Sequence, residues 1–332
     1  MSVIITCNVG SSNIKLSKFD TETHKCERFK VHNIKEVIKW LHSIDKSNIV
    51  AIGHRMIHGG PEFMHPIKID DIILEKLRRY VPLAPLHQLS AIMLIKEIQK
   101  FYSDIKQIVC FDTAFHHTIP EIERLLPLPY WYYKQGIQRY GSHGLSYQYI
   151  ANVLPKFSRI YEKTIAVHLG SSASACAMKN LRSIAITMGF STLDGLMMST
   201  CSGALDSGVV IYLEKELEMK PQEIDRLLYL ESGLQGVSGI SGDMKILLAS
   251  DKPEAKRAVE LYCYLAAKQI VSLLPALGGI DSIVFTGGIG ENAAPIRERI
   301  STLLGWVSNF LIYVIPADEE SVIASSCYAF LA

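Results

Sequence analysis

Residues 8–12, Asn-Val-Gly-Ser-Ser, decide the fold because a similar stretch, His-Leu-Gly-Ser-Ser, recurs at residues 168–172, roughly half the chain away. Each stretch follows a short apolar run typical of a buried strand and precedes a second strand-like segment. Gly-Ser-Ser is a common tripeptide, but the shared strand–turn–strand context favours an internal duplication. We therefore expect a duplicated α/β fold with a central cleft between domains at residues 1–150 and 151–332, and a C-terminal segment able to return to the first domain.

The composition is that of a globular chain without a dominant charge. The 332 residues are 48% hydrophobic and 20% charged, and 34 Lys and Arg oppose 33 Asp and Glu. Because no broad basic field exists, we expect no nucleic-acid partner. The longest apolar run, residues 270–285, is too short for a bilayer and is interrupted by glycine and aspartate, so we expect no membrane association and a cytoplasmic location.

Two further features support that location. No basic segment precedes the first apolar stretch, so a signal peptide is not expected. The seven cysteines lack CxxC spacing, which argues against a disulfide framework and a structural zinc site.

Helical and strand patterns alternate along the chain, as in α/β layers. We expect helices at residues 34–44, 89–102, 142–154, 255–274 and 292–304, strands at 49–52, 105–111 and 283–285, and a loop at 286–292. In such folds, ligands bind at the carboxyl ends of the strands.

Three glycine-rich turns lie at such strand ends: residues 8–12, 168–172 and 286–292. Their backbone N–H groups can form anion-binding nests, and glycine allows phosphate oxygens to approach closely. A single turn of this kind is weak evidence, but three favour a nucleotide-phosphate site. Neither a GxxxxGK[ST] loop nor a GxGxxG motif after the first strand is present, which disfavours P-loop and dinucleotide folds.

Polar side chains stand at other strand ends. Arg55 lies between His54 and His58, where it either binds an anion or pairs with a buried carboxylate; both interpretations stay open. Asp112 follows an apolar strand and either holds a metal or caps a helix. His143 lies between two glycines, Gly141 and Gly144, which favours a functional role over packing in the core.

Together these residues resemble the acetate kinase family, within the superfamily of acetate and sugar kinases, Hsp70 and actin. The matching strings run in family order: residues 8–15 (NVGSSNIK), 54–60 (HRMIHGG), 82–87 (PLAPLH), 112–116 (DTAFH), 139–144 (RYGSHG), 168–174 (HLGSSAS), 188–198 (MGFSTLDGLMM), 232–243 (SGLQGVSGISGD), 285–292 (FTGGIGEN) and 314–324 (VIPADEESVIA). The resemblance implies an actin-like, ribonuclease H-like duplicated fold. It also implies reversible phosphorylation of acetate by ATP with Mg²⁺ or Mn²⁺, and a homodimer.

The resemblance assigns roles by motif. Catalysis falls to Arg55, Asp112 and His143, and the metal to Asn8 and Glu319, with Glu320 open as the alternative to Glu319. The carboxylate pocket is matched by Arg55, Ile57, Leu86, Ser142 and Thr192. The phosphate and nucleotide positions are Asn8, Ser11, Ser12, Lys15, His168, Gly170, Ser171, Ser172, Gly288, Ile289, Gly290 and Asn292.

This chemistry is physically reasonable for a carboxylate substrate. A carboxylate is already ionised at neutral pH, so no strong general base is needed. The difficulty is to bring two anions together, which cations and preorganised N–H donors resolve.

The chain also departs from the family. Cys201 stands where the family usually has an arginine, Ala204 where it has an aspartate and Ala185 where it has an acidic residue, and the chain is shorter than usual. An arginine facing the transferred phosphoryl group is worth about 10³–10⁵ in rate in other phosphoryl-transfer enzymes. Two hypotheses follow: an acetate kinase, or a close propionate or butyrate kinase, and a catalytically weakened nucleotide-binding relative.

Overall fold

The computed structural model describes residues 2–10, 13–23, 25–307 and 309–331, and the chain divides into two compact units. Unit 1 consists of Met1–His117, Ser142–Tyr149 and Asp318–Ala332, and unit 2 of Thr118–Gly141 and Ile150–Ala317. The C-terminal helix therefore belongs to the same unit as the first strand.

Unit 1 is built on a six-stranded sheet with the order β3-β2-β1-β4-β6-β5. The strands are β1 (Val3–Val9), β2 (Ile14–Asp20), β3 (Cys26–Val31), β4 (Ile49–Met56), β5 (Ile67–Lys68) and β6 (Lys106–Phe111). The first three form an antiparallel meander, whereas β4 pairs parallel with β1 and β6 parallel with β4. All seven residues of β1 are buried, as expected for a central strand with both faces covered.

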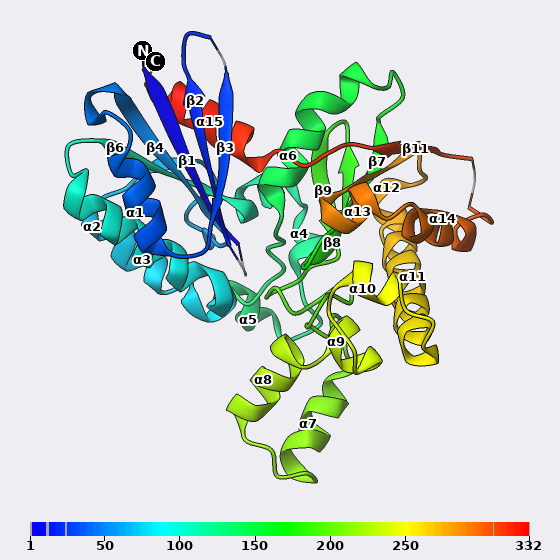
Figure 1. The fold of residues 1–332 in the computed structure, drawn as a ribbon. Coiled ribbons are helices and arrows are strands. Elements are labelled where there is room, and N and C mark those ends of the chain that lie inside the picture. The colour runs from blue at the N-terminus through cyan, green and yellow to red at the C-terminus, as the bar shows by residue number, and fades with distance from the viewer. Residues whose placement is uncertain (1, 11–12, 24, 308, 332) are drawn as a thin grey trace. The chain divides into compact units, whose positions relative to one another are not determined.

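Helices cover both faces of this sheet (Figure 1). They are α1 (Ile34–His42), η1 (Lys46–Asn48), α2 (Asp71–Arg78), η2 (Val81–Leu83), α3 (Pro85–Phe101) and α15 (Glu319–Ala329), and the ranges of η3 (Asp112–Thr118) and α6 (Gly144–Val153) include residues of both units. Helices α1, α2 and α3 share one hydrophobic core with the sheet. Helix α15 packs on the opposite face through Val322, Ile323 and Cys327.

Unit 2 repeats the topology of unit 1. Its sheet has the order β11-β10-β7-β8-β9, with β7 (Lys163–Leu169), β8 (Ala173–Lys179), β9 (Arg182–Ile186), β10 (Ser282–Thr286) and β11 (Leu311–Val314). An antiparallel meander β7-β8-β9 again comes first, and β10 pairs parallel with β7. The predicted duplication is confirmed, because each glycine-rich turn joins the first and second strands of its own meander.

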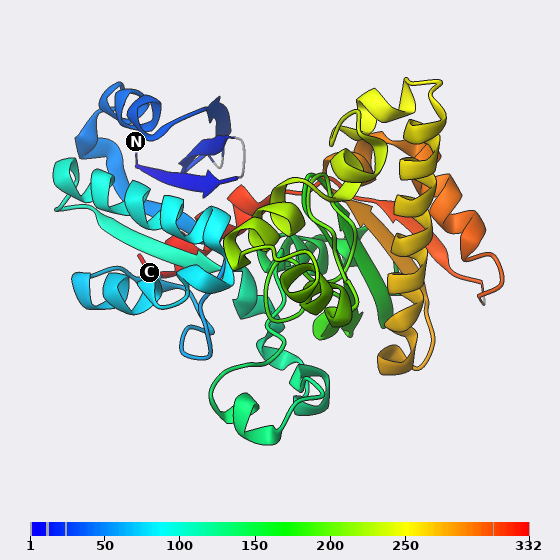
Figure 2. The ribbon, with the colours of Figure 1, turned by 90° about the horizontal axis from the view of Figure 1, so that it is seen from below.

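The helices of unit 2 are more numerous and mostly short. They are α4 (Glu121–Arg124), α5 (Tyr130–Lys134), η4 (Leu154–Lys156), α7 (Ser207–Lys215), α8 (Pro221–Leu230), α9 (Gly233–Ser238), α10 (Met244–Leu248), α11 (Pro253–Ser272), α12 (Leu274–Leu277), α13 (Gly287–Asn292) and α14 (Ala294–Leu303). The long helix α11 buries a small-residue face and lies beside α14 (Figures 1 and 2). No helix among the described residues is long and apolar enough to cross a bilayer. All seven cysteines lie in described segments and carry free thiols.

Two sequence predictions are wrong in detail. The strand predicted to end at residue 52 continues to Met56, because its backbone pairs in parallel with β6 as far as Met56 and Phe111. The His54 side chain also bonds Gln107 of β6, and Arg55 bonds Asp112, which directly follows β6. The segment 286–292, predicted as a loop, contains helix α13. The first turn of helix α13 is stabilised by the Glu291 carboxylate, which accepts a hydrogen bond from the Gly287 N–H at 3.0 Å.

Candidate active site

Arg55 and Asp112 form a buried ion pair at the carboxyl ends of β4 and β6. The Arg55 Nη2 lies 2.6 Å from Asp112 Oδ2, and Nε donates to both carboxylate oxygens at 3.2 and 3.1 Å. The Asp112 side chain is fully buried and that of Arg55 is 13% exposed. Burial alone would lower the pKa of Arg55, but the Asp112 carboxylate raises it above its ordinary value. The guanidinium is therefore always charged, and its forked hydrogen bonds to the Asp112 carboxylate fix its orientation.

A second set of polar groups joins this pair through Asn8, at the end of β1. The Arg55 Nη1 donates to Asn8 Oδ1 at 3.0 Å, and Asn8 Nδ2 donates to Glu320 Oε1 at 2.8 Å. Glu320 and Glu319 begin helix α15 and are both buried. Lys15, on β2, lies 3.8 Å from Glu319 Oε2 and 4.0 Å from Glu320 Oε1. Residues from β1, β2, β4 and α15, together with Asp112 directly after β6, thus form one charged network.

His143 enters this region through an unusual backbone. Its φ is +55°, in the left-handed region, and the side chain is buried. The next residue must be glycine, because a Cβ on Gly144 would overlap the carbonyl oxygen of Asp112. The neighbouring Ser142 Oγ lies 3.4 Å from Asp112 Oδ2, and its carbonyl oxygen accepts a hydrogen bond from the His116 ring at 2.9 Å. Strain held in place by such contacts is common at functional sites.

Sequence reasoning gave no role to His87, although it lies in the matched string at residues 82–87. The pKa of His87 is lowered to about 4, chiefly by burial and in part by the charge of Arg55, while the charge of Asp112 opposes the shift. These mutual effects place the ring near the ion pair. Its Nδ1 is buried and has no hydrogen-bond partner among the residues that the structure describes. The matched string at residues 82–87 contains His87, but a histidine at this position does not by itself indicate a role in the site.

In unit 2, the end of β7 and the start of α13 come together. Thr286 pairs with His168 in the parallel ladder. A Cβ on Gly287, whose φ is +78°, would lie 2.9 Å from the His168 Nε2 and 2.7 Å from the Leu169 carbonyl oxygen. Glycine at this position therefore allows two strand ends to approach closely. The turn after β7 is closed by a hydrogen bond from the Gly170 N–H to the Ser172 carbonyl oxygen at 3.0 Å.

Helix α13 is fastened at both ends. The Glu291 Oε1 accepts hydrogen bonds from the N–H groups of Gly287 and Ala317, at 3.0 and 2.9 Å. Asn292 Nδ2 donates to the Gly288 carbonyl oxygen at 2.9 Å. A Cβ on Gly288 would meet nothing within 4 Å, so this glycine faces open space.

Cys201, where the resemblance expects an arginine, is turned toward the end of helix α8. Its Sγ donates to the Tyr229 carbonyl oxygen at 3.2 Å, beside the Thr200 hydroxyl, which donates to the same oxygen at 2.8 Å. Burial raises the pKa of Cys201. The side chain is therefore a neutral thiol engaged with backbone, and it supplies no positive charge.

The structure brings together Asn8, Arg55, Asp112, Glu319 and Glu320, all within unit 1. Ser11 and Ser12 lie outside the described residues, as does the Leu86 side chain. Among the residues described, no group of three or more His, Cys, Asp and Glu is spaced to hold a metal by itself.

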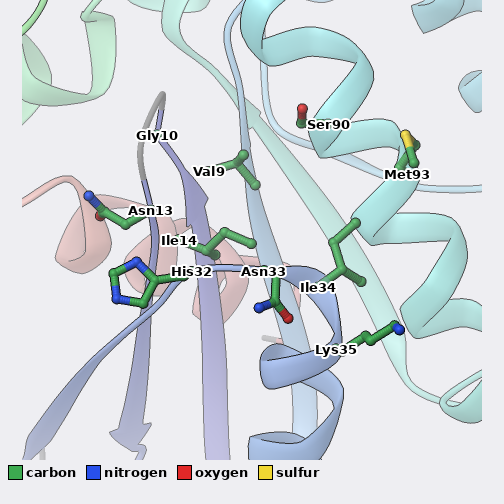
Figure 3. Close-up of a pocket in the computed structure, with 10 residues that line it drawn as sticks. All are labelled: Val9, Gly10, Asn13, Ile14, His32, Asn33, Ile34, Lys35, Ser90 and Met93. Atoms are coloured by element: carbon green, nitrogen blue, oxygen red, sulfur yellow. The ribbon is translucent and has the colours of Figure 1, made fainter.

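A hollow of about 660 Å³ adjoins the β1–β2 turn on the side of α1 and α3 (Figure 3). Val9, Ile14 and Met93 contribute apolar walls, and His32 and Lys35 contribute polar ones. This hollow does not include Arg55, Asp112 or His143, so it is separate from the charged network.

Comparison with known proteins assigns the chain to a family. Residues 30–308 match the Acetokinase family. The acetate kinase of Rhodopseudomonas palustris is 42% identical, over 97% of this chain and 96% of that protein, and the acetate kinase of Rickettsia typhi is 38% identical over 99% of each. The first alignment runs over 384 positions, more than the 332 residues here, so that relative carries segments that this chain lacks.

Solved structures agree. A propionate kinase from Francisella tularensis has a TM-score of 0.89 at 30% identity and covers 98% of this chain and 99% of its own. The acetate kinase of Porphyromonas gingivalis has a TM-score of 0.86 at 28% identity over 100% of both chains. A ROK family glucokinase from Streptomyces griseus, at a TM-score of 0.51 and 11% identity over 99% of each chain, shares the fold alone. The fold and the similarity to acetate kinases define an α/β phosphotransferase. The chain belongs to the acetokinase family.

Proposed function

We propose that this protein is an acetate kinase, which transfers the γ-phosphoryl group of ATP to acetate and works reversibly. The observation that carries the proposal is the Arg55 fork: a permanently charged guanidinium, fixed by Asp112, next to Asn8 and the paired acids of α15. Such an arrangement suits phosphoryl transfer, in which catalysis consists mainly of positioning and charge stabilisation.

The step needs no proton transfer. An acetate oxygen forms a bond to the γ-phosphorus while the bond between that phosphorus and the bridging oxygen breaks, and ADP leaves with the electron pair. Arg55 neutralises charge where the two anions meet, with Asp112 holding it in place. His143, presented at positive φ beside Asp112, donates to the phosphoryl oxygens.

Mg²⁺ fits the residues around Asn8. Asp112 is already paired with Arg55, whereas Glu319 and Glu320 are buried side by side at the start of α15, and a cation offsets the cost of burying two carboxylates. Mg²⁺ in kinases is usually held by one or two carboxylates, waters and substrate phosphates, so a complete protein cage is not required. We assign the metal to Asn8 and Glu319. Glu320, which bonds the Asn8 amide, orients that ligand and is the alternative to Glu319.

We assign the nucleotide to unit 2 and the carboxylate and transferred phosphate to unit 1. His168, Gly170, Ser171 and Ser172 contact the phosphates, together with Ser11, Ser12 and Lys15. The adenosine end lies against Gly288, Ile289, Gly290 and Asn292. The open face at Gly288 and the closed turn at Gly170 support this assignment.

Acetate is ranked ahead of propionate and butyrate. Buried Ile57 and Ser142, with Leu86, are assigned to the acyl pocket. Ile57 is larger than the valine usual in the family, whereas Ser142 is smaller than the usual aromatic, and the two effects on pocket size oppose each other. The structural likeness to a propionate kinase makes propionate the close second. The proposal also places the protein in the cytoplasm as a homodimer.

The test is a coupled ADP-release assay with acetate, propionate and butyrate, run beside a nucleotide-binding titration. Turnover with acetate at the highest kcat/KM supports the proposal. If kcat/KM is highest with propionate or butyrate, that acid takes the place of acetate as the proposed substrate. Nucleotide binding without turnover of any acid contradicts it and favours a weakened relative, for which the neutral Cys201 is the reason.

The assignment of Ile57 to the acyl pocket has its own test. Ile57→Ala is expected to shift preference toward propionate and butyrate, since one methylene in such a pocket is worth about 1–3 kcal/mol, roughly 10- to 200-fold. An unchanged ratio of kcat/KM values among the three acids means that Ile57 does not line the pocket.

A further inference from the structure

The segment from Ile57 to Gly60, directly after β4, is held by hydrogen bonds on two sides. On one side, the Thr113 N–H donates to the Ile57 carbonyl oxygen at 3.2 Å, and Thr113 Oγ1 accepts from the Gly59 N–H at 3.0 Å. The segment also closes on itself, because the Gly60 N–H donates to His58 Nδ1 at 2.9 Å. Gly60 has a φ of +61°, and a Cβ there would overlap the Tyr80 ring, so the path of the chain is tightly constrained.

Gln88 holds the other side of this segment. Its side-chain Oε1 accepts a hydrogen bond from the His58 N–H at 3.1 Å, and its Nε2 donates to the His58 carbonyl oxygen at 2.9 Å. The same Nε2 lies 3.5 Å from the Leu77 carbonyl oxygen. Gln88 is fully buried in helix α3. The Gln88 side-chain amide therefore satisfies both the backbone N–H and the carbonyl oxygen of His58, a residue that is not part of a strand.

We propose that Gln88 is a positioning residue that sets the width of the carboxylate pocket. The inference rests on the proposed function. Gln88 follows Leu86 and His87 on α3, and His58 follows Ile57. The amide pair thus joins the start of α3, which carries Leu86 and His87, to the segment directly after β4, which carries Ile57 and follows Arg55.

The mechanism is geometric. With both hydrogen bonds made, the backbone at residue 58 cannot move away from α3 without leaving a buried N–H and a buried carbonyl oxygen unpaired. The position of Ile57 relative to α3 is therefore fixed before substrate enters. A displacement of about 1 Å in a substrate-positioning group can cost about 10²-fold in rate.

The experiment compares Gln88→Met with Gln107→Met. Both replace a buried glutamine of unit 1 by an unbranched apolar residue of similar length, but Gln107 bonds the His54 ring and not the segment after β4. Gln88→Asn, which keeps the amide on a shorter arm, provides the conservative comparison. For each protein, kcat and KM are measured for acetate, propionate and ATP, and thermal unfolding is recorded.

Gln88→Met is expected to raise the KM for acetate and lower kcat/KM by about tenfold or more, to change the propionate-to-acetate preference, and to leave the KM for ATP within about twofold because unit 2 holds the nucleotide. Gln88→Asn should restore part of the loss, and Gln107→Met should reduce only thermal stability. If Gln88→Met and Gln107→Met lower the melting temperature similarly and both keep the wild-type KM and preference, Gln88 is merely structural and the inference is overturned.

A second measurement covers the case in which Gln88→Met does not fold. In the wild-type protein, hydrogen exchange at the amides of residues 58–60 should be slow without any ligand; rapid exchange there contradicts a fixed pocket wall. Wild-type turnover in the same assay tests the proposed function separately. Absence of turnover there refutes the activity, whereas turnover with unaltered Gln88→Met kinetics refutes only the positioning role.

Discussion

Replacing Arg55 tests the site most directly. Replacing its partner Asp112 as well should restore the stability of an Arg55 variant but not its catalysis. Arg55 makes three hydrogen bonds to the fully buried Asp112 and one to Asn8. Arg55→Met removes them and leaves a buried carboxylate uncompensated, which costs about 3–5 kcal/mol of unfolding free energy. It also removes the cation at the phosphoryl group, for which we expect a loss of about 10³–10⁵ in turnover.

The double variant Arg55→Met/Asp112→Leu separates the two effects. Replacing a buried ion pair by apolar residues is often neutral or stabilising, so most of the lost stability should return. Activity should not return, because the double variant still lacks the guanidinium. Arg55→Lys keeps a charge but not the fork, and should remain well below wild type.

The assays are urea denaturation for stability and the ADP-release assay with acetate for turnover. Nucleotide affinity is measured in parallel and should change far less than turnover. Recovery of turnover together with stability in the double variant would refute the reasoning, since Arg55 would then be a structural partner of Asp112. An equal loss of turnover and nucleotide affinity in Arg55→Met points to the same conclusion.

Three further predictions follow from other parts of the chain. Cys201→Arg should raise kcat at least about tenfold if the missing cation limits the reaction, with Cys201→Ser as the neutral control; an unchanged kcat in both means that another group supplies the charge. Gly144→Ala should abolish activity and lower the melting temperature, because the added methyl overlaps the Asp112 backbone; a fully active variant contradicts the packing of this turn. Burial lowers the pKa of His54 to about 4 and of His58 to about 3. Both rings are neutral when folded and protonated at pH 5 when unfolded, so the stability present above pH 6.5 falls as pH decreases toward the folded pKa, by roughly 2 kcal/mol per histidine at pH 5; urea midpoints that are equal at pH 7 and pH 5 would contradict this.

Local patterns in the sequence were sufficient for the elements and for the duplication. The largely apolar run before the second glycine-rich turn forms strand β7, as expected, because β-branched and apolar residues next to such a turn favour a buried strand. The repeated glycine-rich turn marked equivalent positions in the two sheets, because a hairpin is formed by residues that are close together in the sequence. The family motifs likewise named Arg55, Asp112 and His143 as candidate site residues, and their roles stay predictions.

Other features depended on contacts far apart in the sequence. The strand β4 extends through His54 and Arg55 because its backbone pairs with β6, more than 50 residues away in the sequence, which periodicity cannot indicate. Helix α13 forms in a segment poor in helix formers, where the Glu291 carboxylate is held by the Ala317 N–H, 26 residues further along the chain, and accepts a second bond from the Gly287 N–H.

The pairing of the acids was decided by tertiary structure alone. Two adjacent glutamates in a sequence are equivalent as candidate ligands, yet Glu320 bonds Asn8 and Glu319 lies nearer to Lys15. Asn8 and Glu320 are 312 residues apart and meet because α15 packs on the sheet next to β1. The residue types that this chemistry needs are a property of the sequence, but which atoms touch is settled by register and packing, since hydrogen bonds require contacts of about 3 Å that only the folded chain provides.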